Sequence, residues 1–102
     1  MEYEDKPEAI CTVLQILNSK WGYRLIAELA SSPRRFNQLN KDLPMISTQS
    51  LTNALRHLEQ HGMVLREVTP SVPITVEYSL TPKGEEFFQA LKQMEQWAER
   101  WA

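Results

Sequence analysis

The sequence is poor in cysteine, in glycine and in long apolar runs, and each shortage excludes a class of protein. Cys11 is the only cysteine, so no intramolecular disulfide can form, and we expect a reducing compartment, the cytoplasm. The 3 glycines form no glycine-rich phosphate-binding loop. No apolar run approaches the roughly 18 to 20 residues that cross a bilayer, and the acidic stretch 1–10 is no secretory signal, so we expect no membrane contact.

Catalytic and metal-binding motifs are also lacking, which argues against an enzyme and predicts no cofactor and no metal site. His57 and His61 stand four residues apart, a spacing that puts two ligands on one helix face. Two ligands are too few for zinc, which normally takes three or four from the protein. We therefore interpret His57 as a contact to a phosphate and His61 as a helix-end residue favoured by the helix dipole.

A strong net charge is absent too, because the formal net charge of the chain is only −2. The charged residues are nevertheless unevenly distributed along it. Residues 1–18 hold one base and four acids, residues 19–66 seven bases and three acids, and residues 67–102 three bases and six acids. The central segment is thus positive between two acidic ends. Such polarity can steer a polyanion to one face, although charged runs are commonly just solvated surface.

Helical periodicity opens the chain. Apolar side chains recur at about 3.6-residue spacing over residues 8–18, and again after Ser19, which we expect to cap the second helix. Pro33 ends that helix because proline disfavours helical geometry in the residue before it. The stretch 34–36 is extended enough for a short strand.

Two further helices precede a change of period. We expect Asn37 to cap a brief helix that Pro44 closes, and Ser47 to cap a longer one that Gly62 ends. Beyond Gly62 the period falls to 2: Met63 and Leu65 alternate with Val64, Arg66 and Val68, and a second run continues at Ile74, Val76, Tyr78 and Leu80.

The second half of the chain completes the predicted fold. Pro70 and Pro73 bound the connection between the two strands, and Thr81-Pro82 begins the last helix with a threonine cap and proline in the first turn. The order is α-α-β-α-α-β-β-α, mainly helical with a small β-hairpin. Within 102 residues it predicts one winged helix-turn-helix domain, residues 1–102.

The helix after Ser47 has a polar face suited to nucleic acid. If Leu51, Leu55 and Leu58 face the core, the opposite face presents hydrogen-bonding side chains: Gln49, Thr52, Asn53, Arg56 and Gln60, with Ser50 and His57 at its margins. Asn and Gln can bind adenine bidentately and Arg can bind guanine in the major groove. Any exposed helix face is polar, so it is the adjoining hairpin that favours base recognition.

These features together resemble a known family. The matching residues are Cys11, Lys20-Trp21, Pro33 to Leu39, Leu43-Pro44, Ile46-Ser47, Leu51-Thr52, Leu55, Leu58-Glu59, Gly62 to Val64, Arg66, Val72-Pro73, Val76 to Pro82, and Gly84. In this pattern the chain is similar to the HxlR-type winged helix-turn-helix transcriptional regulators, a MarR-like group. The match covers nearly the whole chain.

The resemblance implies a homodimer that binds a pseudo-palindromic operator in double-stranded DNA, with helix 47–60 in the major groove and the turn 68–75 as the wing on the backbone or minor groove. The residues that we expect at DNA are Arg34, Arg35, Ser47, Thr48, Gln49, Ser50, Thr52, Asn53, Arg56, His57 and Thr75. A winged-helix module that binds proteins, with weak or no DNA binding, is the alternative, favoured by the uncharged wing and the net acidity.

Some positions depart from the family pattern. Ala54 and Thr75 stand where the family often has basic residues, so we expect a wing that contributes little to affinity. Cys11 matches a position where some members resemble thiol switches that respond to oxidants or electrophiles. An activated thiol needs a lowered pKa, whereas a free cysteine is more often a small buried hydrophobe.

The last helix carries aromatic residues on more than one side and thus more apolar surface than one small domain can cover, which commonly marks a protein interface. The resemblance likewise implies dimerisation through both ends of the chain. Packing of the last helix on its own domain accounts for Phe87 and Leu91. We assign to the dimer Val13, Leu14, Leu17, Met94, Trp97, Ala98 and Trp101.

Overall fold

The computed structural model describes residues 7–17 and 20–102, and its elements follow the predicted order. They are α1 (Pro7–Ile16), α2 (Lys20–Ser31), β1 (Arg34–Arg35), α3 (Phe36–Asp42), α4 (Thr48–Gln60), β2 (Val64–Thr69), β3 (Thr75–Leu80) and α5 (Pro82–Trp101). The predicted cap at Ser19 lies outside the described residues. The mixed α+β winged helix-turn-helix class is confirmed.

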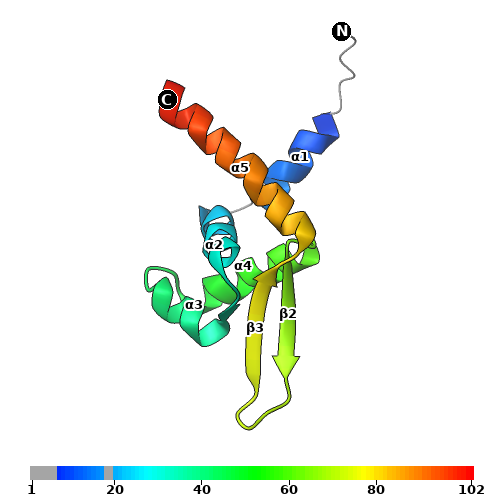
Figure 1. Cartoon of the computed structure of the whole chain (residues 1–102), viewed down its shortest axis with the longest axis vertical. Helices are drawn as coiled ribbons and strands as arrows, with labels where there is room; N and C mark the ends of the chain where they lie inside the picture. Colours follow the sequence, from blue (N-terminus) through cyan, green and yellow to red (C-terminus); the bar gives the residue numbers. More distant parts are fainter. Residues whose placement is uncertain (1–6, 18–19) are drawn as a thin grey trace.

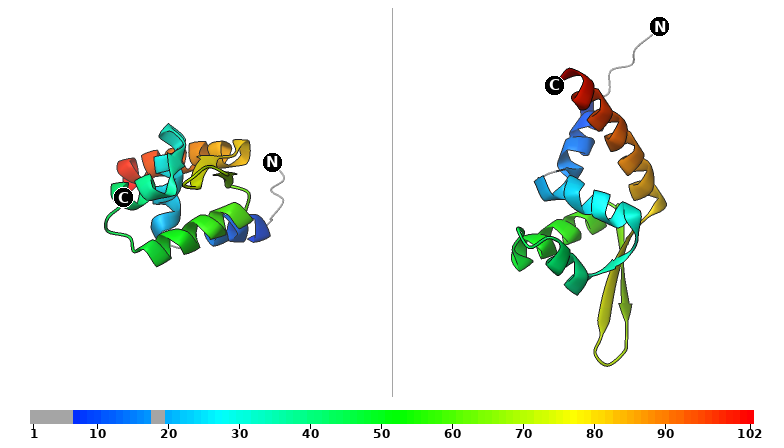
Figure 2. Two further views of the ribbon diagram at one scale, coloured as in Figure 1. Left: turned by 90° about the horizontal axis from the view of Figure 1, so that it is seen from below. Right: turned by 60° about the vertical axis from the view of Figure 1, so that its left-hand side comes forward.

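The molecule is elongated, 58 × 26 × 22 Å, because two helices and the hairpin extend from a helical centre in opposite directions. Helix α2 packs against α4, β3 and α5, and α3 lies beside the end of α2 (Figure 1). The β2–β3 hairpin points away from this centre, whereas α1 and the second half of α5 rise on the other side (Figure 2). Helix α4 therefore lies between the hairpin and the two terminal helices.

The core forms where α2, α3 and α4 meet the start of the hairpin. Leu51, Leu55 and Leu58 are completely buried, as the apolar stripe of α4 predicts. From the other elements the core takes Ile16, Leu25, Ile26, Leu29, Leu39, Leu43, Ile46, Met63, Val64, Tyr78 and Leu91. Burial of each large aliphatic side chain contributes roughly 1.5–3 kcal/mol, so this cluster positions α4 firmly.

The three strands pair antiparallel in the order β1-β3-β2. Two residues of β1 pair with β3, Arg34 opposite Tyr78 and Arg35 opposite Glu77. The predicted alternation fails at Met63, which is buried next to buried Val64 because it lies before β2 and its amide hydrogen bonds to the Leu58 carbonyl. Within β2 itself only Val64 is buried, and Leu65 and Val68 are both exposed.

Local capping explains three of the element boundaries. The Ser47 hydroxyl accepts from the Ser50 amide at 3.1 Å, and Gly62 ends the α4 region with a φ of 73°, which favours glycine. Thr81 caps α5 as predicted. The predicted Asn37 cap is wrong: α3 begins at Phe36, directly after the extended Arg35, whose side chain makes no capping bond.

No helix in the part of the chain that the structure describes has the length and apolar character of a membrane span.

A candidate nucleic-acid interface

The outer face of α4 carries polar side chains in the spacing that the sequence predicts. Gln49, Asn53, Arg56 and Gln60 are exposed. The Gln49 amide donates to the Asn53 side-chain oxygen at 3.1 Å, which links two neighbours one turn apart. These groups can exchange that bond for base edges, because amides bind adenine and a guanidinium binds guanine in the major groove.

The turn between α3 and α4 fixes the start of this face. The Asn40 amide lies 3.3 Å from the Thr48 hydroxyl, so the two helices are joined by side chains as well as by the core. Ser47 and Thr48 are exposed at the N-terminus of α4, whose free amides and positive dipole end favour phosphate. Helix α3, the turn and α4 thus make a helix-turn-helix unit.

The two arginines predicted near DNA differ in their environment. The Arg34 guanidinium lies 2.8 Å from the Glu28 carboxylate and 2.7 Å from that of Asp42, and its side chain is only 17% exposed. Arg34 therefore links α2, β1 and α3, and its charge is compensated within the fold. Arg35 is exposed and makes no ion pair with any described residue.

The hairpin tip is apolar and uncharged. Val72 is fully exposed and Ile74 is 66% exposed, while Thr75 is half-buried at the start of β3 opposite Thr69. No charged residue occurs between positions 68 and 75. Positive charge at the tip is therefore absent, as the sequence predicts.

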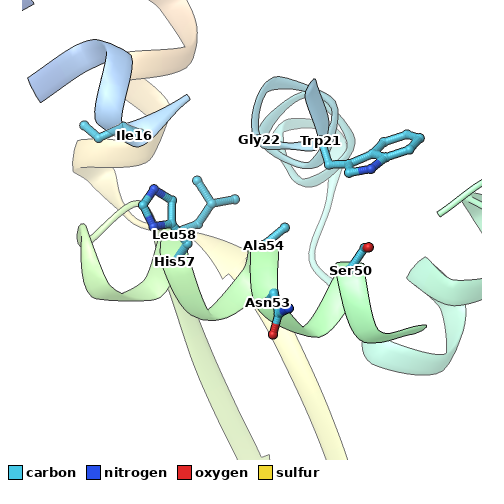
Figure 3. Close-up of a pocket in the computed structure, with 8 residues that line it drawn as sticks. All are labelled: Ile16, Trp21, Gly22, Ser50, Asn53, Ala54, His57 and Leu58. Atoms are coloured by element: carbon cyan, nitrogen blue, oxygen red, sulfur yellow. The ribbon is translucent and has the colours of Figure 1, made fainter. Parts of the chain in front are cut away.

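His57 faces inward instead of outward. Its Nε2 lies 2.6 Å from the Gln15 carbonyl oxygen of α1, so the ring bonds to the N-terminal arm. Figure 3 shows this side of α4, where Ile16, Trp21 and Ala54 help to line a pocket of about 190 Å³ between α4 and the ends of α1 and α2. The ring thus lies on the α1 side of α4, and we leave His57 out of the proposed DNA contacts.

His61 caps the C-terminus of α4 by its backbone, in agreement with a helix-end role. Its ring stands edge-on to His57 with centroids 4.6 Å apart. Among the described residues no group of three or more His, Cys, Asp or Glu side chains could hold a metal ion.

The terminal helices present apolar side chains away from their own core. Leu14 is 62% exposed on α1, and Trp97 and Trp101 are 59% and 70% exposed on α5. Ile10 and Met94 are exposed as well. Leu17 differs, because it packs against the core of its own domain.

One polar contact ties α5 to the central helix. The Tyr23 phenol of α2 donates to the Glu95 carboxylate. This hydrogen bond, with partial burial and the carboxylate's charge, raises the pKa of Tyr23 above its ordinary value of 10.0. Glu95 lies two residues before Trp97, in the exposed second half of α5.

Cys11 is exposed on α1, beside Glu8, Thr12 and Gln15. The interpretation as a small buried hydrophobe is therefore wrong. Its exposure makes the thiol accessible to solvent-borne reagents, which is one of the two conditions for a reactive cysteine.

Comparison with known proteins agrees with this geometry. The model of the HxlR-like helix-turn-helix family matches residues 16–102. The chain belongs to this family. It is a helix-turn-helix transcriptional regulator, and the DNA-binding class predicted from the sequence is confirmed.

Individual relatives cover most of the chain. An HTH-type transcriptional regulator of Synechocystis is 42% identical over 89 residues, which are 87% of this chain and 66% of that protein. The crystal structure of a MarR-family regulator from Enterococcus faecalis superposes with a TM-score of 0.88 at 35% identity, over 98% of this chain and 91% of the other. The reduced form of YodB from Bacillus subtilis gives a TM-score of 0.86 at 31% identity, covering 97% and 96%. A diamide-treated form of YodB gives 0.84 at 31%, covering 98% of each chain.

The sequence interpretation omitted one residue of this surface. Arg66 on β2 is exposed and lies with Thr52 and Arg56 around the hollow between α4 and the hairpin. Its place in the family pattern was visible, but its position beside α4 depends on how the hairpin packs. Strand alternation alone does not show which element a strand residue faces.

Proposed function

We propose that the protein acts as a homodimer that binds a pseudo-palindromic operator in double-stranded DNA. Helix α4 would lie in the major groove, with the β2–β3 hairpin along the backbone or in the adjacent minor groove. The observation that carries this proposal is the exposed, hydrogen-bonding face of α4, held by a buried leucine stripe directly beside the hairpin. The setting that we propose is the cytoplasm.

Within this interface the residues divide by chemistry. Gln49, Thr52, Asn53 and Arg56 project from α4 and would contact base edges. The backbone contacts would come from the remaining positions, which fix the register on the duplex without reading its sequence: Arg35, Ser47, Thr48, Ser50 and Thr75. Arg34 is excluded from this set by its two carboxylate partners.

We further propose that α1 and α5 form the dimer contact, through Val13, Leu14, Met94, Trp97, Ala98 and Trp101. Four of these side chains are more than half exposed although large and apolar: Leu14, Met94, Trp97 and Trp101. Covering them with a second copy removes this surface from water. Helices α1 and α5, the dimer arms, extend away from the hairpin. A dimer formed through them therefore leaves both α4 helices free for two half-sites (Figure 2).

DNA binding is tested with two duplexes, one taken from upstream of the protein's own gene and one of scrambled sequence, each titrated at two salt concentrations. We expect tighter binding to the first duplex and an affinity that falls steeply as salt rises. The Arg56→Ala variant should lose preference between the duplexes. Equal and salt-insensitive binding to both, unchanged by Arg56→Ala, would instead support a winged-helix module that contacts proteins.

A second candidate role rests on Cys11, which we propose as a thiol that responds to oxidants. Its exposure on α1, in the proposed dimer arm, supports a link between thiol chemistry and DNA binding. Two Cys11 thiols from two subunits would form one disulfide, with both electrons and both protons passing to diamide. Diamide should weaken DNA binding by the wild-type protein and leave a Cys11→Ser variant unaffected; equal effects on both would exclude this role.

A further inference from the structure

The hairpin carries one positive charge that faces α4, at the base of the wing. Arg66 lies in β2 opposite Tyr78 of β3, and residues that face each other across strands point to the same side of a sheet. Tyr78 is buried, so this is the side of the hairpin turned towards the helices. Glu67 and Glu77, the next pair, point to the opposite side.

Two hollows meet at Arg66. One, of about 310 Å³, lies between α4 and the hairpin and is lined by Thr52, Arg56, Glu59, Arg66 and Tyr78. The other, of about 440 Å³, extends along β3, with Arg66 and Arg35 among its lining residues. Arg66 thus lines both the hollow beside α4 and the groove along β3.

The charge at this junction is largely uncompensated. Within residues 7–17 and 20–102, Arg35, Arg56 and Arg66 make neither an ion pair nor a side-chain hydrogen bond, in contrast to Arg34. Glu59 is the only acid that lines either hollow. A guanidinium presents a planar set of donors that matches phosphate oxygens, and a free one gains most from such a partner.

We propose that Arg66 binds a phosphate of the DNA backbone at the base of the wing. The proposal rests on the proposed function. It assigns a backbone role because Arg66 lies beside α4 and not on the helix that would enter the groove. It also explains how a hairpin without charge between positions 68 and 75 still contributes to affinity: the charge lies at the base of the wing.

The test uses the whole chain and the two duplexes named above, the native upstream fragment and its scrambled counterpart. Binding of the wild type, Arg66→Gln, Arg66→Lys and a matched control, Arg100→Gln, is measured over a series of salt concentrations. Arg100 loses the same charge from the last turn of α5, at the opposite end of the molecule (Figure 1). Circular dichroism and the unfolding midpoint verify that each variant is folded. Because Arg100 stands next to Trp101 of the proposed dimer contact, sedimentation verifies that every variant has the same oligomeric state as the wild type.

Loss of one phosphate contact from each subunit, two per dimer, should reduce the slope of log affinity against log salt by about 1.8, and the affinity roughly ten- to a hundredfold near 0.1 M salt. We expect this for Arg66→Gln, whereas Arg66→Lys should restore the slope and Arg100→Gln should leave it unchanged. The preference between native and scrambled duplexes should persist in Arg66→Gln, because phosphates carry no sequence information directly.

The possible failures are distinguishable. If the wild type binds DNA with a salt-dependent affinity and Arg66→Gln behaves like Arg100→Gln, the phosphate role is overturned and the proposed function stands. If Arg66→Gln abolishes the preference between duplexes while the salt slope stays unchanged, Arg66 contacts bases, and the proposed phosphate contact is wrong. If the wild type binds neither duplex, the proposed function itself fails.

Discussion

Replacing Gly84 by alanine should destabilise the domain, although alanine is the better helix former. Gly84 lies in the first turn of α5, where a Cβ would stand 2.1 Å from the carbonyl oxygen of Met63. That oxygen accepts from the Thr81 amide at 3.1 Å. The added methyl must therefore displace α5 from the start of β2, or move a backbone group that already has a partner.

The magnitude follows from two opposing effects. Overpacking against a rigid neighbour costs typically about 1–3 kcal/mol, and a backbone carbonyl belongs at the upper end of that range. Alanine regains about 1 kcal/mol of helix propensity over glycine. The net loss should be about 2 kcal/mol of unfolding free energy, or a midpoint roughly 10 °C lower in thermal denaturation.

Gly22→Ala is the matched control. Gly22 is also a buried helical glycine, but a Cβ there would meet its nearest atom, the Ile16 carbonyl oxygen, at 3.4 Å, an ordinary contact. This variant should be unchanged or stabilised by up to about 1 kcal/mol. Both variants are compared with wild type at one protein concentration, because the proposed dimerisation would make the midpoint concentration-dependent. If Gly84→Ala proves as stable as Gly22→Ala, the close approach of α5 to Met63 is wrong.

Three further variants test other parts of the molecule. Ser47→Ala should cost about 1 kcal/mol in urea denaturation, because the Ser50 amide loses its cap; an Ser47→Asp variant should retain the stability. Tyr23 has its pKa raised in the folded state by the bond to Glu95, so its contribution to stability is present below pH 10 and is lost as pH rises through the folded value. A Tyr23→Phe variant should therefore show a smaller alkaline decline, and an unchanged pH profile would refute the contact. Trp101→Ala should shift sedimentation towards the monomer without lowering the helical content, and a fully dimeric variant would remove α5 from the interface.

The elements that the sequence predicted well depend on neighbours close in the chain. The stripe of α4 repeats every three or four residues, and the caps at Ser47 and Thr81 bond within three residues, so pattern alone locates them. The same logic failed at Asn37, because β1 passes directly into α3 and leaves no residue free to act as a separate cap.

The surface chemistry was harder to predict because it depends on distant residues. His57 looked like an exposed margin of α4, yet it bonds to Gln15, 42 residues away. Arg34 looked like a free cation, yet its carboxylate partners lie 6 residues before it and 8 after it on two other elements. A sequence shows the charge of each residue, but compensation of that charge is decided only when the helices pack.

These distant contacts also bear on how a regulator of this shape could transmit a signal. The His57–Gln15 bond joins α1 to α4. Helix α5 is joined to α2 by the Tyr23–Glu95 bond and to the C-terminal end of α4 by the bond from the Lys83 ammonium to the His61 carbonyl. Two half-sites one helical turn apart require α4 helices about 34 Å apart in the dimer. In the proposed dimer, a change at α1 or α5 would alter DNA affinity through the angle between these helices and α4, which the His57–Gln15 bond and the buried Ile16 help to hold. Cys11 lies four residues before Gln15 on α1, which places its chemistry one helical turn from the contact with α4.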